Sequence, residues 1–179
     1  MSDMDLFKWV EEYLSIPPSV ELIFKEKTRT GMILSKAAEE FVQKIFEKLD
    51  YKVTPQVGTR DQRFDLLAQK KDKDLLIEVK LNVRTLDIEI FKNLFLRMEK
   101  IERKYNILLV TFDRSWVVGN YKHRVKHHFL ESSRFDWVSV EDLLGLSGYR
   151  PSCGRLEKDI GIALLRNWRN KMIHSTAQY

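Results

Sequence analysis

Two short apolar segments joined by a charged turn constrain the fold of this 179-residue chain more than any other feature. The segments are residues 63–69 and 75–81, and the turn between them reads KKDKD over residues 70–74. Apolar runs of strand length on either side of such a turn predict a β-hairpin. The second run, LLIEVKL, has apolar neighbours around each of its charges. This composition predicts a central strand of a sheet rather than a solvated edge.

The predicted hairpin carries charged residues in an apolar setting. Alternation along a strand places Glu78 and Lys80 on one face and Ile77 and Val79 on the other. Asp65 lies on the neighbouring strand. Buried charges cost several kcal/mol unless they are paired or bound to a metal. Two carboxylates on adjacent strands can converge on a hard cation, which prefers oxygen ligands. A lysine beside them suits hydrolysis of phosphodiesters with Mg²⁺ or Mn²⁺.

Helical and strand-like segments alternate around this hairpin. A strong apolar stripe predicts a helix from about residue 30 or 35 to 49, and the residues that follow the hairpin predict another over 86–104. Further strands are expected at 51–57, 106–112 and 135–140, with Ser139 as a possible helix cap. This order predicts an α/β domain with a central mixed sheet flanked by helices. Additional helices are expected at 2–14 and 156–174, so the chain divides into 1–29, a core over 30–146, and 147–179.

Composition limits the class of protein. Hydrophobic residues make up 44% and charged residues 32%, and no uncharged apolar run approaches the roughly 20 residues that span a bilayer. The acidic, amphipathic beginning of the chain does not resemble a signal peptide. The single cysteine, Cys153, cannot form an internal disulfide, which favours a cytoplasmic setting. The net charge of +5 comes from a basic excess after residue 50, which suggests a polyanionic partner.

The order of these residues resembles the PD-(D/E)XK nuclease superfamily. Asp65 is followed after twelve residues by Glu78-Val79-Lys80, and a helix bearing an acidic residue precedes them. The resemblance covers residues 30–146 in the order αβββαβ. It looks closest to Mrr-like restriction enzymes and archaeal Holliday-junction resolvases, in which a Glu-x-x-Val helix precedes a Gly-Tyr-x-Val strand entry. Here the corresponding segments read EEFV over 39–42 and DYKV over 50–53.

This resemblance implies a restriction-endonuclease-like core and a set of roles. Asp65, Glu78 and the carbonyl of Val79 would bind Mg²⁺ or Mn²⁺, and Lys80 would be the catalytic lysine. On a helical wheel Glu39 lies on the shoulder of the apolar stripe, whereas Glu40 points to solvent, so we expect Glu39 to add a second carboxylate. Phe64 replaces the proline of the family motif. No Gln-x-x-x-Tyr follows in the helix over 86–104, which argues against the RecB-like exonucleases.

Basic residues around the site are candidates for nucleic-acid contact. The segment 121–129 mixes basic and aromatic residues, which suits phosphate contact and base stacking, although a solvated helix face explains it equally well. Arginines near the hairpin can clamp a backbone phosphate. The predicted set is Arg60, Arg63, Arg84, Lys122, Arg124 and Lys126.

The sequence therefore predicts a metal-dependent DNA endonuclease, expected to act as a homodimer and open to a partner subunit that supplies specificity. One alternative is a nucleic-acid-binding or assembly module that keeps the fold without cleaving. Another is a metal-independent ribonuclease, because Arg169-Asn170 with His174 resembles the Arg-Asn-x-x-x-His signature of HEPN ribonucleases. The sequence does not distinguish duplex, junction, flap or single-stranded substrates.

Overall fold

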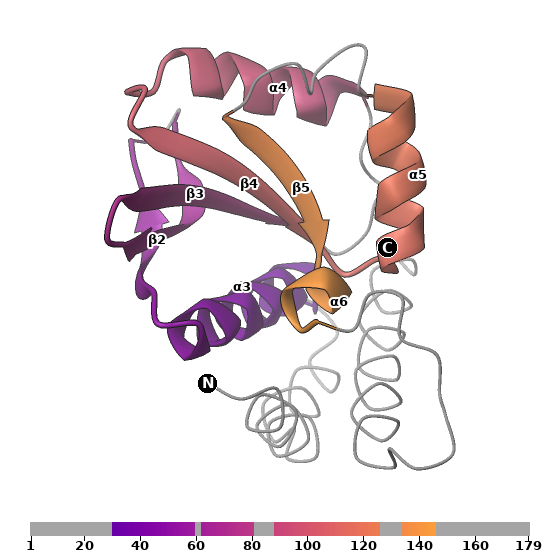
Figure 1. Cartoon of the computed structure of the whole chain (residues 1–179), viewed down its shortest axis with the longest axis horizontal. Helices are drawn as coiled ribbons and strands as arrows, with labels where there is room; N and C mark the ends of the chain where they lie inside the picture. The colour runs from indigo at the N-terminus through magenta and orange to yellow at the C-terminus, as the bar shows by residue number, and fades with distance from the viewer. Residues whose placement is uncertain (1–29, 60–61, 81–87, 126–133, 146–179) are drawn as a thin grey trace.

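A mixed β-sheet with helices on both faces forms the described part of the chain (Figure 1). The computed structural model describes residues 30–59, 62–80, 88–125 and 134–145. In chain order the elements are α3 (Thr30–Lys48), β1 (Lys52–Val57), β2 (Phe64–Lys70), β3 (Lys73–Lys80), α4 (Ile88–Glu99), β4 (Tyr105–Thr111), α5 (Ser115–Val125), β5 (Phe135–Ser139) and α6 (Val140–Leu143). The predicted α/β class is confirmed. The helices predicted at 2–14 and 156–174 lie outside the described residues.

The five strands lie in the order β1-β2-β3-β4-β5, so β3 is the central strand, as its apolar sequence predicts. β1 and β3 are both antiparallel to β2, whereas β4 pairs in parallel with both β3 and β5. Parallel neighbours require crossover connections. α4 lies between β3 and β4 in the chain, and α5 lies between β4 and β5. The sheet is therefore mixed: β1, β2 and β3 form its antiparallel part, and β3, β4 and β5 form its parallel part.

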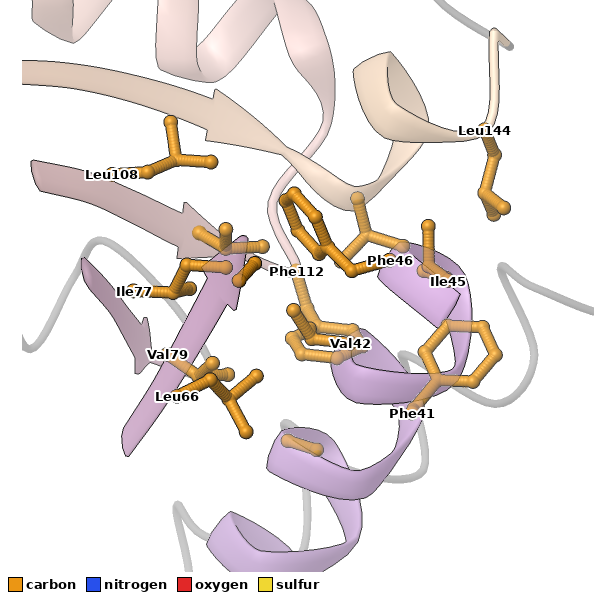
Figure 2. Close-up of a cluster of buried hydrophobic side chains, with 14 residues drawn as sticks. Phe41, Val42, Ile45, Phe46, Leu66, Ile77, Val79, Leu108, Phe112 and Leu144 are labelled. Atoms are coloured by element: carbon orange, nitrogen blue, oxygen red, sulfur yellow. The ribbon is translucent and has the colours of Figure 1, made fainter. Parts of the chain in front are cut away.

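The core consists of two clusters, one on each face of the sheet. On one face the apolar stripe of α3, which includes Phe41 and Ile45, packs against Ile77 and Val79 of β3 (Figure 2). On the other face Leu94 and Met98 of α4 and Val118 of α5 pack with side chains of the central strands and β5, namely Leu76, Ile107, Leu109 and Trp137. Residues 77 and 79 therefore face α3, and residues 76, 78 and 80 face α4.

The turn of the central hairpin is tighter than the five charged residues predict. Only Lys71 and Asp72 lie outside the strands, and Lys70 pairs with Lys73. Lys71 has a φ of 48°, in the left-handed region that short hairpin turns require. Backbone pairing continues through charged residues because it does not depend on side-chain polarity. Gln69 Nε2 also donates to Asp74 Oδ1 across the strands at 3.2 Å.

Two helical elements differ from the predictions. The helix predicted to reach residue 104 ends at Glu99, and the amides of Lys100 and Ile101 bond to carbonyls three residues back. These bonds form a tighter turn than an α-helix has, and Ile101 then packs against the core cluster that contains Leu94 and Met98 before β4 begins. α5 was not among the predicted elements, because its sequence has no continuous apolar stripe: Val118 is buried and Val117 and Tyr121 are partly buried, among mostly polar residues.

The ends of two helices explain local sequence features. Asp50, which follows α3, has a φ of 64° and occupies the left-handed conformation common just after a helix. Ser139 caps α6, as predicted: its hydroxyl accepts from the Asp142 amide at 3.1 Å, and the Asp142 carboxylate accepts from the Ser139 amide at 2.9 Å. Among the described helices, none is long and apolar enough to cross a bilayer.

Candidate active site at the open end of the β2–β3 hairpin

The paired region of β2 and β3 ends beside the predicted site. Pairing runs from Lys70 with Lys73 to Leu66 with Ile77. The next opposed residues would be Asp65 and Glu78, and like charges directly opposite one another are unfavourable. Here the Val79 amide donates to Asp65 Oδ2 at 2.7 Å. The structure thus brings the two predicted carboxylates together at an open hairpin end.

Glu78 is buried and is paired with two cations. Lys80 Nζ lies 2.8 Å from Glu78 Oε1, and Arg97 Nη2 lies 3.2 Å from Oε2. The Glu78 side chain is 9% exposed, whereas that of Lys80 is 35% exposed. The predicted placement of Glu78 and Lys80 on one face is confirmed. The lysine ammonium connects the buried carboxylate to the surface.

One oxygen of Glu78 keeps unused hydrogen-bonding capacity. Oε2 is buried and has no hydrogen-bond partner among the described residues. Arg97 Nη2 is close enough to Oε2 for charge attraction, but the geometry is not that of a hydrogen bond. Buried carboxylate oxygens normally accept hydrogen bonds or bind a cation. Arg97 offsets the charge of this oxygen, so what Oε2 retains is the capacity to accept a hydrogen bond.

Arg97, near the end of α4, was not predicted as a member of the site. Its Nη1 donates to the carbonyl of Arg63 at 2.5 Å, and its Cζ lies 4.6 Å from the centroid of the Phe64 ring. In the sequence it is one basic residue on an amphipathic helix, and no local spacing distinguishes it from a surface arginine. Only the packing of α4 over the hairpin brings it to Glu78.

The carboxyl groups of the site influence one another electrostatically. Burial raises the pKa of Asp65 to about 6, and the neighbouring Glu78 charge adds to this effect, while the Val79 amide and Lys80 oppose it. Burial also raises the pKa of Glu39 to about 7, followed by repulsion from Asp65, and Lys80 lowers it. Glu39, on α3, therefore shares the electrostatic environment of the hairpin site. Glu40 is exposed, as the helical wheel predicts.

Among the predicted basic residues that the structure describes, Arg63 lies close enough to the carboxylates for its charge to lower the pKa of Glu39. Lys122 lies at edge strand β5, where it pairs with Asp136. Lys122 belongs to α5, and the strand that it contacts, β5, is separated from β3 by β4. Arg124 is exposed on the same helix, with its Cζ 6.0 Å from the Tyr121 ring centroid. Arg60, Arg84 and Lys126 lie outside the described residues.

The residues present suit a cation that keeps part of its water shell. Within residues 30–59, 62–80, 88–125 and 134–145, no group of three or more His, Cys, Asp or Glu side chains is arranged to hold a metal ion. Mg²⁺ commonly binds through one or two carboxylates together with waters and substrate phosphates. Asp65 and Glu78 supply such a pair, and Glu78 Oε2 has no hydrogen-bond partner among the described residues. The role predicted for the Val79 carbonyl stays a prediction.

No protein-family model matches the sequence, and neither a curated protein nor a solved structure matches the chain. The geometry itself defines an α/β domain with a mixed five-stranded sheet. At the centre of that sheet, one buried and one half-buried carboxylate lie beside a partly exposed lysine. The resemblance to PD-(D/E)XK nucleases therefore remains an inference from the residues and their order.

Proposed function

We propose that the chain is a metal-dependent nuclease with a restriction-endonuclease-like core, acting on DNA in the cytoplasm. One observation carries this proposal: Asp65 and Glu78 meet where the β2–β3 pairing ends, and Lys80 pairs with Glu78 at the edge of solvent. The order α3-β1-β2-β3-α4-β4 supports it, because it follows the αβββαβ order of that superfamily.

Each residue has a distinct role in this proposal. Asp65 and Glu78 would hold Mg²⁺ or Mn²⁺, which when bound supplies charge neutralisation at the scissile phosphate and lowers the pKa of its water. Lys80 Nζ would orient the attacking water and offset charge on the phosphate. Glu39 would accept a proton near neutral pH, since its pKa is raised to about 7. Two copies of the chain would cut the two strands of a duplex.

A second candidate function is nucleic-acid binding without cleavage. The observation that favours it is the ion pairing of Glu78 with both Lys80 and Arg97, which already offsets the buried charge without a metal. Such a cluster could stabilise the open hairpin end by itself. Arg169 and His174, the residues of the ribonuclease alternative, lie outside the described residues.

A cleavage assay distinguishes these functions. Purified protein is incubated with labelled duplex DNA, single-stranded DNA and RNA, in Mg²⁺, Mn²⁺ or EDTA, beside the Lys80→Ala and His174→Ala variants. Lys104→Ala is the matched control, because Lys104 forms an exposed ion pair with Glu102 at 3.1 Å, away from the site. We expect cleavage of DNA that needs the divalent cation and is lost only in Lys80→Ala.

Other outcomes reject the nuclease proposal in different ways. Cleavage that persists in EDTA, or that Lys80→Ala leaves intact, contradicts a metal site at the hairpin. RNA cleavage lost only in His174→Ala supports the ribonuclease alternative. Nucleic-acid binding without cleavage under any condition supports the binding module.

A further inference from the structure

We propose that Arg97 is a positioning residue that holds the open end of the β2–β3 hairpin and so fixes the separation of Asp65 and Glu78. The backbone pairing of these strands ends at Leu66 and Ile77. Beyond that pair, the hydrogen bond from the Val79 amide to Asp65 joins β2 to β3 through a side chain. Arg97 adds a second connection, which comes from α4.

The contacts of Arg97 reach both strands. Nη1 donates to the carbonyl of Arg63, the residue that precedes β2, and Nη2 lies 3.2 Å from Glu78 Oε2 on β3. One planar guanidinium therefore bridges the backbone at the start of β2 and the carboxylate of β3. A lysine ammonium has no second, rigidly linked nitrogen that could lie beside the carboxylate while the first donates to the carbonyl.

The position of Arg97 is itself fixed by packing. The guanidinium lies over the ring of Phe64, which is 1% exposed, and the side chain of Arg97 is 22% exposed. Phe64 pairs with Val57 of β1 but has no backbone partner on β3. Arg97 therefore provides a connection from this end of β2 to β3. The ring and the carbonyl together hold the arginine without using the hydrogen-bonding capacity of Glu78 Oε2.

This arrangement has two consequences. Loss of the guanidinium should loosen the hairpin end while leaving the rest of the sheet intact, and it should weaken cation binding by letting the carboxylates move apart. The first consequence depends only on the fold. The second rests on the proposed nuclease function, so the two are measured separately.

The test compares the full-length wild type, Arg97→Lys and Arg103→Lys. Arg97→Lys keeps the charge and removes the guanidinium, and Arg103 is an exposed arginine in the turn before β4, so the same change there is the matched control. Amide hydrogen exchange is followed by NMR at Val79 and, as a reference for global opening, at Leu109 in β4. Mn²⁺ affinity is measured by calorimetry on the same samples.

We expect the Val79 amide to exchange about tenfold faster in Arg97→Lys, with Leu109 unchanged, because only local opening is affected. We expect Mn²⁺ affinity to fall about tenfold, a change typical for loss of a group that orients a ligand. Arg103→Lys should match the wild type in both measurements. Phe64→Leu, which removes the ring beneath the guanidinium, should change Val79 exchange in the same direction and serves if Arg97→Lys does not fold.

Val79 exchange equal to that of the control overturns the proposal, even if cleavage falls. Equal acceleration at Val79 and Leu109 also overturns it, since Arg97 would then stabilise the whole fold rather than the hairpin end. If the wild type binds no Mn²⁺ and cleaves nothing while Val79 alone exchanges faster, the positioning role stands and the nuclease proposal fails.

Discussion

The backbone amide of Val79 and the carboxylate of Asp65 are joined by a 2.7 Å hydrogen bond at the point where the β2–β3 pairing ends. This bond replaces one that a continuous hairpin would make between two backbone groups. It turns the Asp65 side chain toward β3 and places its charge beside Glu78. The same carboxylate therefore has a structural role and a proposed cation-binding role, and the two can be separated by mutation.

Asp65→Asn and Asp65→Ala should differ in their effects on stability. Asn retains a carbonyl oxygen that can accept from Val79 and removes a half-buried charge, so the free energy of unfolding at pH 7 should not fall. Ala leaves the Val79 amide without this acceptor and should cost about 1–3 kcal/mol. Both variants should lose Mn²⁺ binding. Urea unfolding with calorimetry tests this prediction, and equal destabilisation by both variants would show that the hydrogen bond is unimportant.

Cation binding should strengthen as the pH rises from about 5 to about 8. Burial and the neighbouring charges raise the pKa of Asp65 to about 6 and that of Glu39 to about 7, so protons compete with the cation in this range. Mn²⁺ affinity measured at several pH values tests the prediction. In Glu39→Gln, the part of the rise between about pH 6 and pH 8 should disappear. A flat profile in the wild type would contradict the assignment of these carboxylates to the cation site.

Glu39→Gln should also stabilise the fold in a pH-dependent way. The folded-state pKa of Glu39, about 7, lies above its ordinary value of 4.5. The protonated side chain therefore contributes its full stability below pH 4.5, and this contribution is lost as the pH rises through about 7. At pH 8 the substitution should raise the free energy of unfolding by about 1 kcal/mol, because solvent screening reduces the effect of a half-buried charge. At pH 4 the change should be close to zero. Glu40→Gln, on the exposed side of α3, is the control and should have no such effect.

Lys80→Met should separate catalysis from cation binding. Methionine keeps most of the length and apolar contact of the lysine but removes the ammonium that lies 2.8 Å from Glu78. We expect cleavage to fall at least about 100-fold, in line with loss of a group acting directly on the reacting atoms, while Mn²⁺ binding persists. Parallel cleavage and calorimetry measurements decide this. Retained cleavage would move the catalytic role away from Lys80.

Ser139→Ala tests the contribution of the α6 N-cap to stability. The hydroxyl of Ser139 accepts from the Asp142 amide, and its loss at a helix N-cap should cost about 1 kcal/mol. Thermal or urea unfolding at pH 7 measures this. Mn²⁺ affinity should not change, since the cap makes no contact with the carboxylates; a loss of affinity would indicate that α6 also supports the site.

Local periodicity in the sequence determined the strands and their faces. The apolar residues of LLIEVKL predicted a central strand, and alternation placed Glu78 and Lys80 together; both predictions are confirmed. The stripe of α3 likewise predicted which side of that helix is buried. These features depend on residues near one another in the chain, whose relative directions follow from the geometry of a strand or a helix.

The tertiary structure alone decided how distant segments meet. It opened the β2–β3 pairing at Leu66, ended α4 at Glu99, added α5 as a crossover, and brought Arg97 to Glu78. None of these has a signal in sequence spacing, because each depends on the packing of one element against another. The physical reason is that residue order fixes the direction of a side chain within its own element, whereas its partners are set by the placement of the whole element. The charges of the candidate site could therefore be predicted, but the arginine beside Glu78 could not.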